Sequence, residues 1–216
     1  MTEDVEFYVE EARASGGPVV ELACGTGRIS VPVAKAGVAV IGVDASPAML
    51  EVAREYARLE GVELDLRRGD MRDPPVSERV PLVLIPFRSL LHMMTDADRL
   101  QALRAARELL VPGGRLVFDV FAPSREDVED THGRWLEREP GIFERADWDE
   151  GERTLTLSVR RGEEASTMQL AWQTPGEWRL FLDLAGFEID AEWGWFDRRP
   201  FSGGEDVVFS AIRRDA

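Results

Sequence analysis

Apolar residues form short continuous runs that alternate with longer segments of helical spacing. The runs cover residues 19–23, 38–44, 62–66 and 81–87, and a fifth follows a Pro-Gly-Gly turn within 110–121. Helical spacing is found at 3–14, from Ile29 onward, and at 47–59, 95–110 and 175–185. Continuous apolar strands separated by helices are typical of a parallel sheet that is buried on both faces. This pattern predicts an α/β fold with helices on both faces of a mostly parallel sheet.

Residues 122–174 have a different pattern. Apolar and polar residues alternate over 154–159, which predicts a half-exposed antiparallel strand. We expect flanking strands at 141–148 and 167–172, and therefore a small antiparallel sheet inserted after strand five. The interpretation is a single domain over 1–216, with 122–174 as an inserted subdomain on the substrate side. After the helix at 175–185, a last pair of strands ends with 206–212.

A glycine turn follows the first strand. Gly25 and Gly27 lie between the strand and the helix that begins near Ile29, which is where open α/β sheets bind nucleotide-like ligands. The third glycine of a dinucleotide fingerprint is replaced by Ser30, and Glu21 lies four residues before Gly25. A carboxylate at this place repels a pyrophosphate and attracts a cationic ligand. S-adenosylmethionine is such a ligand, since it carries a sulfonium and an ammonium but no phosphate.

The segment Glu-Leu-Ala-Cys-Gly-Thr-Gly at 21–27 resembles motif I of the class I S-adenosylmethionine-dependent methyltransferases. That family usually has glycine where this chain has Ala23, and alanine is tolerated there if its φ is negative. The resemblance implies a Rossmann-like sheet of seven strands, of which the seventh is antiparallel. It also implies methyl transfer from S-adenosylmethionine to a small-molecule acceptor by in-line displacement.

Asp44 ends the second strand, where a carboxylate typically binds a ribose diol. The resemblance implies that Ala45 and Met49 lie near the adenosine, although Met49 could equally be an ordinary core residue. After strand three, Gly69, Asp70 and Met71 resemble the adenine-binding turn of the family. A carboxylate there can accept a hydrogen bond from the exocyclic amino group.

Strand four continues into a segment that corresponds in place to motif IV, which lines the methyl-transfer site. Ile85-Pro86-Phe87 replaces the Asn/Asp/Ser-Pro-Pro-aromatic signature of enzymes that methylate base amino groups, and this argues against a nucleobase substrate. His92 follows this strand and is the candidate general base, with packing as the alternative. His132 is a poorer candidate, and Arg88 could bind an acidic substrate or pair with one of the many acids.

A short leading helix often lies over the cofactor in the resembled family, and Tyr8 is the candidate contact on the helix at 3–14; the alternative is a helix that covers a sheet edge. The full set of predicted cofactor-binding residues is Tyr8, Glu21, Ala23, Gly25, Gly27, Arg28, Asp44, Ala45, Met49, Gly69, Asp70, Met71, Pro86 and Phe87.

Composition narrows the function further. The formal net charge of −15 argues against nucleic acid as substrate. The single cysteine, Cys24, excludes an internal disulfide and a cysteine-built zinc site, and we expect no metal. No apolar run is long enough for a membrane span. We therefore expect a cytoplasmic enzyme that is a monomer or a homodimer.

Two alternatives to catalytic methyl transfer remain. One is a non-catalytic protein that keeps an S-adenosylmethionine pocket. The other is a nicotinamide-dependent oxidoreductase, which would share Asp44; its short-chain class needs Tyr-x-x-x-Lys, and neither Tyr8 nor Tyr56 has Lys35 at that offset. The six tryptophans all lie at or beyond residue 135, where they could form a substrate pocket or seat the insertion on the main sheet.

Overall fold

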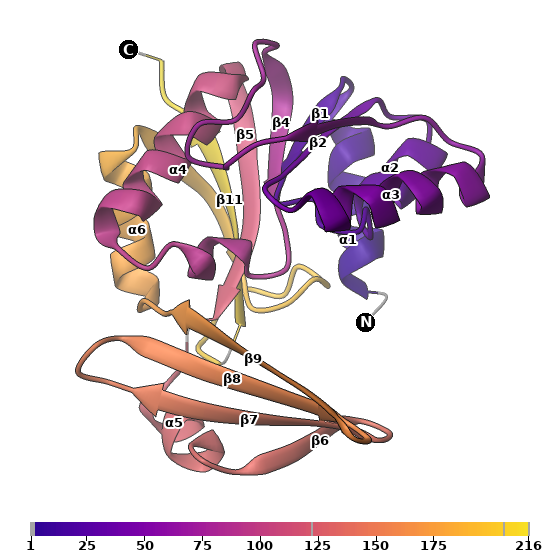
Figure 1. Cartoon of the computed structure of the whole chain (residues 1–216). Helices are drawn as coiled ribbons and strands as arrows, with labels where there is room; N and C mark the ends of the chain where they lie inside the picture. Colours follow the sequence, from indigo (N-terminus) through magenta and orange to yellow (C-terminus); the bar gives the residue numbers. More distant parts are fainter. Residues whose placement is uncertain (1–2, 122, 205, 216) are drawn as a thin grey trace.

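The computed structural model describes residues 3–121, 123–204 and 206–215 and contains two separate sheets (Figure 1). The larger sheet has seven strands in the order β10-β11-β5-β4-β1-β2-β3. Their bounds are β1 Val19–Leu22, β2 Val40–Asp44, β3 Asp65–Arg68, β4 Val80–Ile85, β5 Leu110–Phe121, β10 Phe187–Trp193 and β11 Asp206–Arg213.

Strand direction in this sheet agrees with the prediction. β1 pairs in parallel with β2 and β4, β2 with β3, and β4 with β5. β11 is antiparallel to both of its neighbours, β5 and β10. The seven-stranded, mostly parallel sheet with an antiparallel last strand is confirmed.

Helices cover both faces of the main sheet. Neighbouring residues of each strand point to opposite sides, so a strand that is apolar throughout has apolar side chains to bury on both faces. Val19, Leu82 and Val117 pack toward α1 (Glu3–Ser15) and α2 (Ser30–Lys35), and α3 (Pro47–Glu60) lies on the same side (Figure 1). The neighbouring residues Val20, Val83 and Phe118 belong to a second cluster, which faces α4 (Asp96–Leu109) and α6 (Pro175–Leu184). The continuous apolar runs are therefore explained by burial on both faces.

Strand three is displaced from its predicted position. Residues 62–66 were expected to form it, but β3 is Asp65–Arg68. Gly61 ends α3 in the left-handed conformation, and the Val62 amide donates to the Ala57 carbonyl, so Val62 completes the helix cap. β3 is an edge strand that is only partly buried, and its apolar residues therefore do not mark its bounds.

The inserted sheet has four antiparallel strands in sequential order, β6 Trp135–Glu139, β7 Ile142–Asp149, β8 Thr154–Arg161 and β9 Glu164–Ala171. It lies below the main sheet in Figure 1. The sequence interpretation found β7, β8 and β9 but missed β6 and the preceding helix α5 (Arg125–Thr131). Both are short and mostly exposed, so neither leaves an apolar pattern.

The tryptophans divide between the two roles considered for them. Trp178 is fully buried beneath the main sheet and contacts Phe118, with ring centroids 5.6 Å apart. Trp148 packs against Phe121 at the end of β5 and against Trp172, and thereby joins the inserted sheet to the main one. Packing accounts for Trp172 and Trp178, whereas Trp148 and Trp195 also line a cavity.

Candidate functional site

The predicted cofactor loop lies at the carboxyl end of β1. Gly25 has φ +54°, and a Cβ built on it would meet no atom within 4 Å, so open space lies beside the loop. Gly27 has φ +79°. A Cβ built on it would lie 3.3 Å from the Ala53 Cβ and 3.3 Å from the Val31 side chain, so this glycine permits close packing of α3. The first glycine therefore faces space that a ligand can fill, while the second supports the loop from behind.

Ala23 differs from the expectation. It was expected to tolerate the glycine position with a negative φ, but its φ is +59°, in the left-handed region. That conformation costs an alanine about 1–2 kcal/mol. The neighbouring Cys24 amide donates to the Val43 carbonyl at 3.0 Å, which holds the turn against β2 despite this strain.

Asp44 joins the two halves of the predicted cofactor site. One carboxylate oxygen accepts from the Gly25 amide and the other from the Ser46 amide, each at 2.8 Å. The Gly69 amide donates to the Asp44 carbonyl at 3.0 Å, so the turn after β3 lies directly beside it. Asp44 remains partly exposed, and its free lone pairs are available to a ribose diol.

The residues predicted near the adenosine surround this point. Ala45 is exposed, and Met49 at the start of α3 is 46% exposed, which contradicts the alternative that Met49 is a core residue. Asp70 is held by Arg72, whose guanidinium donates to both oxygens, and these hydrogen bonds lower the pKa of Asp70. Met71 is buried against the main core. The adenine contact of Asp70 and Met71 stays a prediction.

Glu21 is 2% exposed and accepts a hydrogen bond from the Ser30 hydroxyl. Burial raises its pKa to about 8, and the Ser30 hydrogen bond and the Arg28 charge only partly oppose this effect. Without a bound cation the carboxyl group is therefore mostly protonated at neutral pH. A cationic ligand would favour its ionised form.

Tyr8 is fully buried, and its hydroxyl donates to Asp119 at 2.5 Å. No surface of Tyr8 is accessible to a cofactor in this arrangement, and the helix that carries it packs across the sheet. The predicted cofactor contact of Tyr8 therefore has no support in the structure. Asp4 of the same helix instead pairs with Arg28 of the cofactor loop at 2.6 Å.

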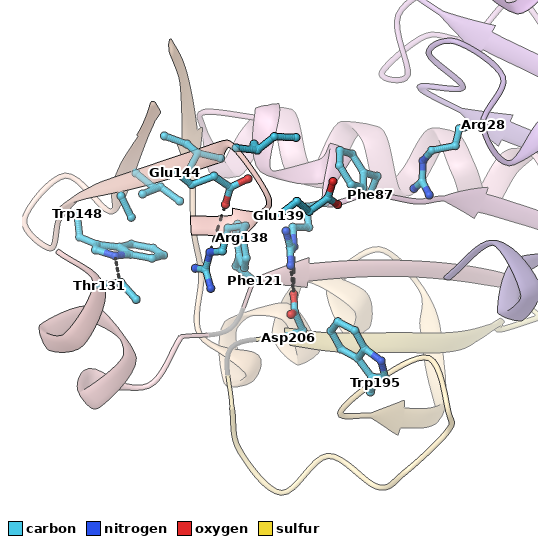
Figure 2. Close-up of a pocket in the computed structure, with 15 residues that line it drawn as sticks. Arg28, Phe87, Phe121, Thr131, Arg138, Glu139, Glu144, Trp148, Trp195 and Asp206 are labelled. Atoms are coloured by element: carbon cyan, nitrogen blue, oxygen red, sulfur yellow. Dashed lines mark hydrogen bonds and ion pairs between the residues drawn. The ribbon is translucent and has the colours of Figure 1, made fainter. Parts of the chain in front are cut away.

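A cavity of about 580 Å³ lies between the two sheets, at the carboxyl edge of the parallel strands (Figure 2). Phe87 follows β4, Phe121 ends β5 and Asp206 begins β11, so the main sheet supplies one wall. The opposite wall is one face of β7 and β8, where alternate residues point inward. Those residues are Ile142, Glu144, Ala146, Trp148, Leu155 and Leu157.

Arg28 connects the cofactor loop to this cavity. It lines the cavity, and its guanidinium lies 4.8 Å from the centre of the Phe87 ring. The preceding Pro86 is buried, whereas Phe87 is 58% exposed. Pro86, Phe87 and Arg28 thus lie where the predicted cofactor site meets the cavity, which is where a methyl group and its acceptor must meet.

Neither histidine lines the cavity among the described residues. His92 ends the short helix η1 (Ser89–His92), is exposed, and has its pKa lowered by partial desolvation. The Nδ1 atom of His132 accepts from the Trp148 amide at 3.1 Å, which fixes α5 against β7. The general-base role of His92 stays a prediction. Sequence reasoning missed Glu139 and Glu144, because only folding brings the insertion over the end of β4, whereas Trp148 is one of the tryptophans considered for a substrate pocket.

Comparisons with known proteins match this chain to methyltransferases. A family model described as a methyltransferase domain matches residues 19–114. The cypemycin N-terminal methyltransferase of a Streptomyces species is 26% identical over 208 residues, which is 92% of this chain and 84% of that protein. A ubiquinone biosynthesis O-methyltransferase of Cereibacter sphaeroides is 38% identical over 100 residues, but the match spans only 39% of its length.

The solved structure of the CcbJ methyltransferase from Streptomyces caelestis superposes with a TM-score of 0.86 at 26% identity, covering 100% of this chain and 97% of that one. The fold and the glycine loop define a Rossmann-like methyltransferase. Over most of its length the chain is similar to S-adenosylmethionine-dependent methyltransferases of class I, and these similarities support methyl transfer from that cofactor to a small-molecule acceptor.

The residues around the glycine loop fit this cofactor. The open space beside Gly25, the carboxylate of Asp44 and the exposed Met49 suit the amino acid, ribose and adenine parts, respectively, of a ligand without phosphate. When bound, S-adenosylmethionine supplies a methyl group on a sulfonium sulfur. No helix of the described residues is both long and apolar enough to cross a membrane.

Proposed function

We propose that the methyl acceptor is an amine of a small molecule, held in the cavity between the sheets. The charges of the cavity support this proposal. Arg28 pairs with Asp4 at 2.6 Å, Arg88 with Asp206 at 2.7 Å and Arg138 with Glu144 at 3.5 Å. Each cavity arginine therefore already has an acidic partner.

Glu139 also belongs to the cavity lining, and its carboxylate is not paired with any of these arginines. It lies at the end of β6 and lines the cavity, and across residues 3–121, 123–204 and 206–215 it has no hydrogen-bond or ion-pair partner. Phe87, Phe121 and Trp148 line the same cavity (Figure 2). An acid left without a partner beside aromatic rings favours an ammonium group, through both charge and the ring faces.

The cavity residues can also prepare the amine. Only a neutral nitrogen has the lone pair that can attack the methyl carbon and displace S-adenosylhomocysteine as the leaving group, so the bound ammonium must first lose a proton. Glu139 can accept that proton, because it is the one carboxylate of the described cavity lining that no arginine holds. Phe87 and Phe121 give the reacting side an apolar lining, and alignment of the two reactants supplies most of the rate.

The relatives are named for different acceptor atoms. The cypemycin enzyme is an N-terminal methyltransferase, and the match covers most of both chains. The ubiquinone enzyme is an O-methyltransferase, but the match covers only 46% of this chain and 39% of that protein. The cavity charge favours the amine. We further propose, on the acidic sequence and the single buried Cys24, a cytoplasmic monomer or homodimer that does not act on nucleic acid.

A matched panel of acceptors tests the proposal. Benzylamine, phenethylamine and glucosamine are each incubated with S-adenosylmethionine and the enzyme, beside benzyl alcohol, phenethyl alcohol and glucose. Mass spectrometry should detect methylation of an amine and not of its alcohol counterpart. Glu139→Gln should raise the KM of that amine roughly tenfold, while Glu163→Gln in the exposed β8–β9 turn should not. Methylation of the alcohols alone would overturn the amine proposal, and a protein that binds S-adenosylhomocysteine without any turnover would be a non-catalytic binder.

A further inference from the structure

Two neighbouring residues at the edge of the cavity have strained backbones. Phe87 and Arg88 follow β4, and each has a φ of +58°. Neither residue is a glycine, so each left-handed conformation costs about 1–2 kcal/mol. Strain of this kind persists only where surrounding contacts enforce it, and it is concentrated at functional sites.

Asp119 on β5 supplies those contacts. Its carboxylate accepts from the Phe87 amide at 2.7 Å and from the Arg88 amide at 3.0 Å, one on each oxygen. The Tyr8 hydroxyl from α1 donates to the same oxygen as Phe87, at 2.5 Å. Three segments that are distant in the sequence thus meet at one carboxylate. Because both amides of the strained pair point to it, the carboxylate determines the path of the chain after β4.

Burial of the Asp119 carboxylate costs free energy. Asp119 is 4% exposed, and its pKa is raised by burial even though Tyr8 and Arg88 oppose that effect. A buried carboxylate usually destabilises a fold unless its hydrogen bonds are satisfied. Its neighbours on β5, Phe118 and Val120, are apolar core residues, so strand formation alone does not explain an acid at this position.

The side chains of the strained pair form part of the cavity wall. Phe87 carries the ring that Arg28 covers. Arg88 pairs with Asp206, and its guanidinium lies 3.7 Å from the centre of the Phe121 ring. Asp119 is not among the cavity-lining residues, so it acts on the cavity only through Phe87 and Arg88.

We propose that Asp119 and Tyr8 are positioning residues for methyl transfer: Tyr8 orients the carboxylate, and the carboxylate holds Phe87 and Arg88 in the conformation that aligns the acceptor with the methyl group. The inference rests on the proposed location of the acceptor in the cavity. It predicts that both variants lose turnover while the cofactor site, built around Gly25 and Asp44, stays intact.

The test uses Tyr8→Phe and Asp119→Asn in the full chain. Tyr8→Phe removes the hydroxyl that donates to Asp119. Asp119→Asn replaces one carboxylate oxygen with an NH₂ group, which cannot accept a hydrogen bond, so either the Phe87 or the Arg88 amide loses its acceptor. Tyr56→Phe on α3 and Asp130→Asn on the exposed side of α5 are the matched controls. S-adenosylhomocysteine binding is measured by calorimetry, and hydrogen exchange is measured at the Phe87 and Arg88 amides. Turnover is measured with whichever amine or alcohol of the acceptor panel the wild type methylates.

We expect S-adenosylhomocysteine affinity within about twofold of wild type, and kcat/KM lower by roughly tenfold to a hundredfold. The loss should be larger for Asp119→Asn, with faster exchange at Phe87 and Arg88 than in either control. Unchanged turnover and exchange in Tyr8→Phe and Asp119→Asn would overturn the proposal, as would equal losses of turnover and cofactor affinity, which indicate general disruption. If no panel compound is methylated, the amine proposal fails, while unchanged exchange at both amides would by itself refute the positioning role.

Discussion

Replacing Glu21 with glutamine should remove a pH dependence of stability that the wild type carries. The carboxyl group lies on the central strand β1 and is 2% exposed. Burial raises its pKa from 4.5 to about 8, against the opposing effects of Ser30 and Arg28. Glutamine keeps the shape and one acceptor for the Ser30 hydroxyl, but it cannot ionise.

The sign follows from proton binding. The folded state holds its proton up to about pH 8, whereas the unfolded chain releases it near pH 4.5, so the folded state binds more protons in between. The stability linked to this group is complete below pH 4.5 and is lost as the pH rises to about 8. Between about pH 6 and pH 9 the loss covers roughly two pKa units, or about 2–3 kcal/mol.

Urea denaturation at these two pH values measures the effect. The wild type should lose about 2–3 kcal/mol more free energy of unfolding between them than Glu21→Gln does. Glu163→Gln, in an exposed turn, should lose as much as the wild type. If Glu21→Gln and the wild type lost stability in parallel, the buried carboxyl would not have the raised pKa, and the reasoning would fail. A saturating amount of S-adenosylhomocysteine, measured separately, should shrink the difference if the ligand's ammonium stabilises the ionised form.

Three further predictions concern the cofactor site and the base. Ala23→Gly should raise the free energy of unfolding by about 1 kcal/mol by relieving the left-handed strain. The control Ala105→Gly, inside α4, should lower it by a similar amount. Thermal melts measure both variants, and equal destabilisation of the two would show that Ala23 is not strained. Asp44→Ala should weaken S-adenosylhomocysteine binding by tenfold or more, because it removes a carboxylate that also holds the Gly25 and Ser46 amides, and an unchanged affinity by calorimetry would remove that role. His92→Ala tests the general-base prediction: if His92 is the base, kcat should fall while S-adenosylhomocysteine affinity stays normal, and near-normal turnover would refute the role, in keeping with its exposed position outside the described cavity lining.

Local patterns predicted the main sheet because its signals are local. The run at 38–44 is apolar throughout since β2 is covered on both faces, and it ends at Asp44 as expected. The helix starts are equally local: the side chains of Ser46 and Thr95 cap α3 and α4 by accepting from amides three residues later. The glycine turn and the acid before it also define the kind of cofactor within a few residues.

Tertiary structure decided everything that depends on which segments meet. The left-handed Ala23 arises because Cys24 must reach the Val43 carbonyl on another strand, and no local pattern shows this. Tyr8 was predicted at the cofactor, yet it meets Asp119, which is 111 residues away along the chain. Glu139 enters the cavity only because β6 and β7 fold over the end of β4. The sequence alone thus determined the sheet and its cofactor, because backbone pairing and burial leave periodic signals. The acceptor cavity and its supporting carboxylate required the fold, because contacts between distant segments leave none.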